Sequence, residues 1–80
     1  MNKINCMVYE SDNTRIYYSL RNDNNTVDVY VYAGDKNKFF PDDFHEFKLS
    51  DNNYTWYDLI KRLKKLNFNS FQVFKKLYKK

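Results

Sequence analysis

The sequence predicts an α+β fold: an antiparallel three- or four-stranded β-sheet followed by two C-terminal α-helices packed on one face. The first third of the chain alternates in hydropathy with a period of two, as half-buried strands do, and the last third repeats apolar residues at helical spacing. Eighty residues allow one small core, so we expect a single domain over 1–80, with a β-meander over 1–50 and a helical hairpin over 54–80.

Three runs in the first third predict strands joined by short polar turns. The segment 22–25 is a strong turn signal, because Asn and Asp tolerate left-handed backbone and bond their own main chain. Connections this short imply antiparallel neighbours. Gly34-Asp35 closes the meander. The side chains expected to face the core are Ile4, Cys6, Val8, Ile16, Leu20, Val27, Val29 and Val31.

The middle of the chain carries two competing patterns. Phe39, Phe40, Phe44 and Phe47 are spaced as on one face of a short helix, and Pro41 suits its first turn. Phe47 and Leu49 flanking a lysine read equally as a strand. We favour a loop or single turn near 41–45 and a short strand near 45–50.

The last third predicts two helices. Thr55 and Asp58 form a capping-box pattern at the start of the first, and Asn67 can take the left-handed conformation that ends it. Ser70 offers the N-cap of the second, and an edge strand over 70–76 is the alternative. The apolar faces expected on the core are Trp56, Leu59, Ile60, Leu63 and Leu66, then Phe71, Val73, Phe74, Leu77 and Tyr78.

The sequence offers little catalytic equipment. Cys6 is the single cysteine, which excludes a disulfide scaffold, and only His45 could act as its base. The densest set of possible metal ligands matches no metal-binding spacing; it comprises Asp42, Asp43, His45 and Glu46. We therefore expect a protein that is not an enzyme, with no cofactor, no catalytic residues and no metal site.

Charge divides the chain into two parts. Residues 1–60 hold ten acids and six bases, whereas residues 61–80 hold eight bases and no acid. A basic segment of this kind is typical of proteins that bind an anionic partner, so nucleic-acid binding is the alternative function. Lysine supplies phosphate contacts rather than base readout, which predicts affinity without much sequence choice. The residues concerned are Lys61, Arg62, Lys64, Lys65, Lys75, Lys76, Lys79 and Lys80.

An aromatic surface on the outer side of the predicted sheet is the favoured site. Tyrosine and arginine are enriched at protein–protein hot spots, and the acidic balance of residues 1–60 disfavours phosphate at this face. We therefore expect a protein partner rather than RNA. The predicted protein-binding residues are Tyr9, Arg15, Tyr17, Tyr30 and Tyr32.

In general style, a compact 80-residue α+β chain with Asn-rich turns and no active-site constellation resembles small phage-encoded proteins that block a host factor, including anti-CRISPR proteins. The resemblance implies an inhibitor from a phage or mobile element. Its partner would be a host protein or a protein–nucleic-acid complex, and its location the host cytoplasm. Many anti-CRISPR proteins are acidic mimics of nucleic acid, and the basic segment 61–80 departs from that pattern. No apolar run is long enough to span a membrane, so no membrane partner is expected.

Overall fold

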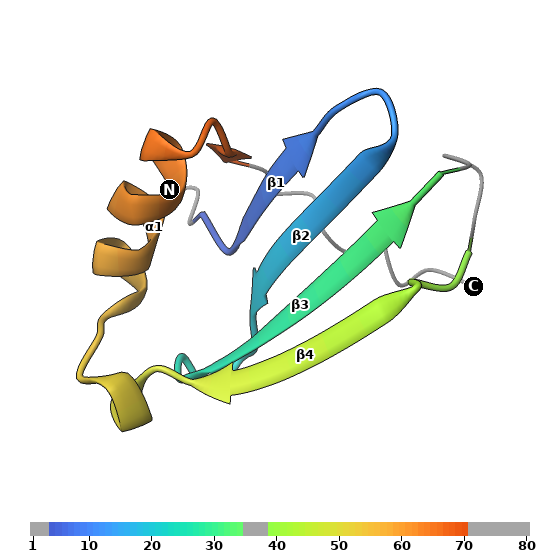
Figure 1. Ribbon diagram of the computed structural model, residues 1–80. Helices are drawn as coiled ribbons and strands as arrows, with labels where there is room; N and C mark the ends of the chain where they lie inside the picture. The colour runs from blue at the N-terminus through green and yellow to red at the C-terminus, as the bar shows by residue number, and fades with distance from the viewer. Residues whose placement is uncertain (1–3, 35–38, 71–80) are drawn as a thin grey trace.

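The computed structural model of this protein describes residues 4–34 and 39–70. In this part of the chain, five strands and one α-helix form an α+β arrangement (Figure 1). The fold class is therefore confirmed at the level of an antiparallel sheet with helical packing. The elements are β1 (Cys6–Glu10), β2 (Thr14–Leu20), β3 (Thr26–Ala33), β4 (Asp43–Lys48), the short 3-10 helix η1 (Ser50–Asn52), α1 (Trp56–Lys65) and β5 (Asn69–Ser70).

The five strands form one antiparallel sheet in the order β4-β3-β2-β1-β5. Strands β1 to β4 form the predicted meander, in which β1 pairs with β2, β2 with β3 and β3 with β4, while β5 pairs with β1. Tyr17 lies opposite Tyr30 between β2 and β3, and Tyr30 lies opposite Phe44 between β3 and β4. Because side chains alternate along a strand, this register places these three rings on the same face of the sheet.

The turn between β2 and β3 forms as the Asn- and Asp-rich segment predicts. Asn24 has a φ of 60°, in the left-handed region. One carboxylate oxygen of Asp23 accepts hydrogen bonds from the backbone N–H groups of Asn25 and Thr26, each at 2.8 Å. The other accepts from the Thr26 hydroxyl at 2.6 Å. The side chain of Asp23 therefore satisfies backbone donors that the sheet leaves unpaired.

Both ends of α1 carry the signals read from the sequence. The Thr55 hydroxyl accepts from the backbone N–H of Asp58 at 3.1 Å, and the Asp58 carboxylate accepts from that of Thr55 at 3.2 Å. At the other end, Asn67 has a φ of 69°. The N–H groups of Phe68 and Asn67 donate to the carbonyls of Leu63 and Lys64, which is the Schellman arrangement.

The core lies between α1 and one face of the sheet, called here the α1 face. Burial decreases along the strands with distance from the helix: Val27 and Leu20 are buried, whereas Ile16 and Val31 are half-buried. Figure 1 shows α1 beside one end of the sheet. Buried core side chains are Met7, Leu20, Val27, Val29, Leu49, Leu59, Ile60, Leu63 and Phe68.

The prediction of which side of β1 faces the core is wrong. Met7 and Tyr9 lie on the α1 face, and Cys6 and Val8 lie on the other side, called here the opposite face. Both alternating sets in β1 are apolar, so its periodicity does not determine which set faces the core. Phe68 determines it, because the Phe68 ring contacts the rings of Tyr9 and Tyr18 at centroid distances of 5.5 and 5.4 Å.

The end of α1 departs from the predicted helical face in one residue. Leu66 is 59% exposed rather than packed on the core. It occupies the C-cap, and the chain reverses at Asn67, which brings the ring of Phe68 into the core.

Only one α-helix is present in the described part of the chain, where two C-terminal helices were predicted. The predicted N-cap of the second, Ser70, instead lies in β5 opposite Met7, as Asn69 lies opposite Val8. This agrees with the edge-strand alternative as far as Ser70. The predicted helical residues after Ser70, from Phe71 onward, lie outside the described residues.

The favoured turn near 41–45 is wrong in its extent, because β4 begins at Asp43. The helical alternative for this segment is also wrong. Pairing with β3 decides the conformation: Phe47 lies opposite Val27 on the α1 face, and Phe44 lies opposite Tyr30 on the other. Of the four aromatic residues at helical spacing, Phe44 and Phe47 lie on two faces of β4, whereas Phe39 and Phe40 precede the strand.

Candidate protein-binding surface

Four of the five predicted protein-binding residues meet on the opposite face. The rings of Tyr17 and Tyr32 contact edge-on, with centroids 5.8 Å apart. The Arg15 guanidinium lies 5.0 Å from the centroid of the Tyr32 ring, and its Nη1 lies 3.4 Å from the Tyr17 hydroxyl oxygen, to which it donates. Tyr30 lies on the same face, between Tyr17 and Phe44 in the sheet.

Phe44 belongs to this surface and was not predicted. Its ring lies 5.2 Å from that of Tyr30, and its side chain is 45% exposed. The signal that could have found it is alternation from Phe44 to Glu46 and Lys48, which the favoured turn at 41–45 obscured. We call Arg15, Tyr17, Tyr30, Tyr32 and Phe44 the aromatic–arginine cluster.

The fifth predicted residue, Tyr9, is not part of the cluster. It lies on the α1 face, where its ring packs against Phe68.

Burial and charge shape the tyrosines of the cluster. Tyr17 is buried, whereas Tyr30 and Tyr32 are half-buried. Burial raises the pKa of Tyr32, the nearby Tyr17 adds to the rise, and the Arg15 charge opposes it. The Tyr32 phenol therefore stays neutral at physiological pH and keeps a hydrogen-bonding hydroxyl beside an apolar ring.

A polar network borders the cluster on the same face. Arg21 donates two hydrogen bonds of 2.8 Å to the two oxygens of Asp28, and its Nη2 lies 3.2 Å from a Glu46 oxygen. Asp28 is only 6% exposed, so the guanidinium compensates a buried carboxylate. The hydrogen bond to Asp28 also raises the pKa of Arg21. This network fixes the sheet beside the aromatic surface.

The residues considered for chemistry are held apart. Cys6 and His45 lie on opposite faces, with β2 and β3 between their strands. Burial raises the pKa of the Cys6 thiol to about 12, so it is protonated at neutral pH. A thiolate is the nucleophilic form of cysteine, so this protonated thiol is a poor nucleophile.

The acidic set around His45 is also divided. The His45 imidazole lies 3.0 Å from an Asp43 oxygen on the α1 face, whereas Glu46 points to the opposite face and bonds Arg21. Asp42 accepts from the backbone N–H of Ala33 at 2.6 Å. Within residues 4–34 and 39–70, no group of three or more His, Cys, Asp or Glu side chains could hold a metal ion.

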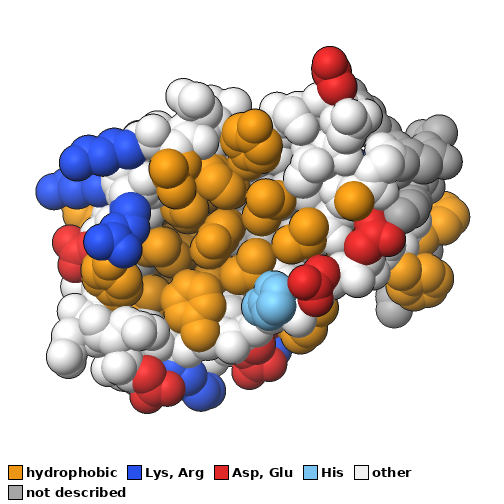
Figure 2. All heavy atoms as spheres, viewed as in Figure 1, with side chains coloured by type: hydrophobic (Ala, Val, Ile, Leu, Met, Phe, Trp, Pro, Cys, Tyr) orange, Lys and Arg blue, Asp and Glu red, His pale blue; other side chains and the backbone are white. Residues whose placement is uncertain are grey.

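Four predicted nucleic-acid-binding residues are exposed on α1: Lys61, Arg62, Lys64 and Lys65. Figure 2 shows basic side chains grouped at this end of the molecule. The Arg62 guanidinium lies 5.4 Å from the centroid of the Tyr54 ring. The other four predicted residues, Lys75, Lys76, Lys79 and Lys80, lie outside the described residues.

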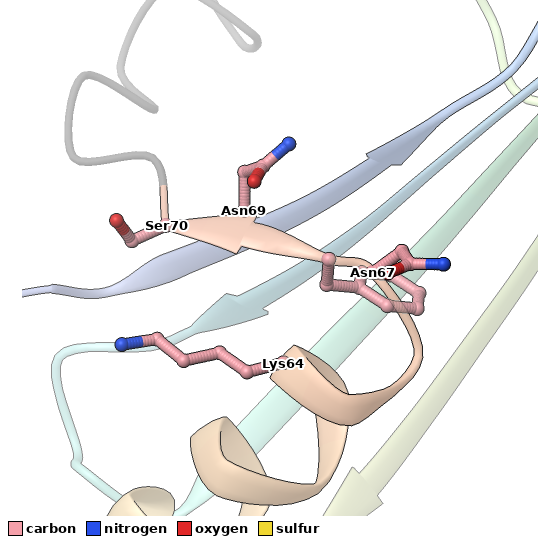
Figure 3. A pocket seen from close by; sticks show the side chains of 5 residues that line it. Lys64, Asn67, Asn69 and Ser70 are labelled. Atoms are coloured by element: carbon pink, nitrogen blue, oxygen red, sulfur yellow. The ribbon is translucent and has the colours of Figure 1, made fainter.

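An open hollow of about 510 Å³ lies between the end of α1 and β5. Its lining residues are Lys64, Asn67, Phe68, Asn69 and Ser70. Figure 3 shows the Lys64 amine and the Ser70 hydroxyl extending to the same side, while the Asn67 side chain points away from them. This arrangement offers one positive charge and one hydroxyl to a polar ligand.

Half-buried apolar side chains cover much of the α1 face beyond the helix. They are Tyr9, Ile16, Tyr18, Val31 and Phe47, and we call them the α1-face patch. Figure 2 shows a continuous hydrophobic surface in this region, bordered by the imidazole and by acidic side chains. A helix of ten residues is about 15 Å long, too short to cover the whole face.

No protein-family model, curated protein sequence or solved structure matches this chain. None of the helices in the described part of the chain is long and apolar enough to cross a membrane.

Proposed function

We propose that this protein is a non-enzymatic binding module that recognises another protein through the aromatic–arginine cluster. The observation that carries the proposal is that tyrosine, phenylalanine and arginine side chains from three adjacent strands meet on one face. Interface cores are enriched in aromatic residues and arginine, and rigid tyrosine rings give large contact areas at a small entropic cost.

The cluster suits a protein better than a phosphate backbone. Arg15 is its single basic side chain, and its guanidinium already lies over Tyr32. Beside the cluster, the carboxylates of Asp28 and Glu46 both form ion pairs with Arg21. A partner that buries the cluster would therefore gain apolar contact and tyrosine hydroxyl bonds rather than charge neutralisation.

We also propose a class of partner. With its small size and no match to a catalytic spacing, the chain resembles phage-encoded inhibitors of host factors, including anti-CRISPR proteins. On this basis the partner is a host protein or a protein–nucleic-acid complex, and binding would block its activity.

Affinity capture from a host lysate tests the proposal when wild type is compared with matched tyrosine variants. Tyr30→Ala and Tyr32→Ala each remove a cluster ring, whereas Tyr57→Ala removes a ring that is 74% exposed on α1. Hot-spot losses of about 2 kcal/mol correspond to roughly thirty-fold weaker binding. We expect one protein to bind wild type and Tyr57→Ala alike and to bind Tyr30→Ala and Tyr32→Ala at least about thirty-fold more weakly. Equal binding by all four proteins would contradict the proposal.

Nucleic-acid binding through α1 is the second candidate. It is favoured by the exposed row of Lys61, Arg62, Lys64 and Lys65 and by the hollow beside Lys64. Each phosphate contact contributes about 0.9 to the slope of log K against log salt on duplex DNA, so the double variant Lys64→Gln/Lys65→Gln should flatten that slope by about 1.8. Fluorescence anisotropy at two salt concentrations measures this. A dissociation constant weaker than about 100 μM at physiological salt would reject this candidate.

A further inference from the structure

One edge of the described sheet is open to pairing. Strand β4 pairs with β3 on one side and, among the described strands, with none on the other. The N–H of Leu49 donates to the carbonyl of Asn25, which fixes the alternation of hydrogen bonds along β4. The backbone groups of Phe47 and His45 therefore point to β3, and those of Glu46 and Lys48 point outward. Such an edge is a template for another strand.

We propose that two copies of this chain associate through their β4 edges, antiparallel, with the two-fold axis passing at Phe47. In this register Glu46 of one copy lies directly opposite Lys48 of the second copy, and the reverse pair forms at the same time. Directly opposite side chains of unlike charge stabilise an antiparallel pair. The outward backbone groups of Glu46 then bond across the axis to those of Lys48, whose carbonyl also accepts from the side-chain amide of Asn52 at 3.2 Å.

Charge selects this register over its neighbours. A two-fold axis at Glu46 would place two Glu46 carboxylates directly opposite each other, and like charges in that position destabilise the pair. An axis at His45 would place the two imidazoles opposite each other and would leave Glu46 facing Phe44. The axis at Phe47 is the one that pairs both charged side chains of the outer edge with opposite charges.

The same register brings apolar surfaces together. Phe47 meets its own copy at a position without direct backbone hydrogen bonds, where Cα atoms of facing residues lie only about 4.5 Å apart and side chains are closest. Phe47 also belongs to the α1-face patch, which ends at this edge. Association therefore joins the two patches into one surface across a continuous sheet.

Charge reversal tests the proposal through the molar mass, measured by light scattering with size-exclusion chromatography. Over about 10 μM to 1 mM, wild type should rise from 9.9 kDa towards twice that mass, since a short edge contact gives micromolar affinity at best. Glu46→Lys and Lys48→Glu should each stay at 9.9 kDa, because each places like charges opposite each other. The double variant Glu46→Lys/Lys48→Glu should recover the dimer. Lys61→Glu, on exposed α1, is the control and should dimerise as wild type does.

Cysteine cross-linking tests the register independently of the charge variants, should either of these lose its fold by circular dichroism. Phe47→Cys places two thiols opposite each other and should form a disulfide-linked dimer, whereas Glu46→Cys should not, because its neighbour across the axis is Lys48. The native Cys6 is buried and does not interfere. A wild type that stays monomeric at 1 mM, reversals that leave the dimer unchanged, or equal cross-linking of the two cysteine variants would overturn the proposal.

Discussion

Asp23 is the residue whose individual contribution is clearest. Its two carboxylate oxygens accept three hydrogen bonds from Asn25 and Thr26. These bonds, led by that from the Thr26 hydroxyl, lower the pKa of Asp23 from 3.8 to about 2. The turn between β2 and β3 is therefore tied to the ionised form of one side chain.

A pH dependence follows from Asp23. Because its pKa is lower in the folded state, its stabilising contribution is complete above about pH 4 and is lost as the pH falls towards 2. The isosteric variant Asp23→Asn should therefore lose less stability than wild type over that interval. Urea unfolding at several pH values measures the difference. Part of the decrease should remain in the variant, because Thr55 also lowers the pKa of Asp58; parallel curves for the two proteins would contradict the role given to Asp23.

At the scale of elements, α1 was predictable because its signals are local. The capping box of Thr55 and Asp58, the apolar spacing and the left-handed Asn67 all act within a few residues. The strand predicted near 45–50 overlaps β4, but its start at Asp43 and the inward side of β1 were not predictable, because both depend on distant partners. Pairing with Val27 of β3 fixes the strand conformation at Phe47. Packing against α1 and Phe68 determines that Met7 and Tyr9 face the core.

Two leucines of α1 give a matched test of the helix face. Leu63 is 2% exposed in the core, whereas Leu66 is 59% exposed at the C-cap. Leu63→Ala should lower the free energy of unfolding by about 2–5 kcal/mol, because it removes packed methyl groups and leaves a cavity. Leu66→Ala should change it by less than about 0.5 kcal/mol. Urea denaturation of the two variants decides the matter, and equal losses would show that the helix packs differently.

On the scale of the whole molecule, the two faces of the sheet carry different sets of side chains. The α1 face holds the core, and the opposite face holds the aromatic–arginine cluster beside Arg21 and Asp28. Four members of the cluster could be predicted from alternation alone, because polar turns fixed the order of β2 and β3. Tyr9 could not be placed correctly, since both alternating sets of β1 are apolar, and Phe44 was hidden by an ambiguous pattern.

The most direct test of the proposed function is a titration of the isotope-labelled 9.9 kDa protein with its captured partner, followed by amide chemical shifts in NMR spectra. We expect the largest changes in the cluster on β2, β3 and β4, around Tyr30, Tyr32 and Phe44. Amides on α1 from Lys61 to Lys65 should change little. Changes concentrated on α1, with the cluster unaffected, would contradict protein recognition through this face.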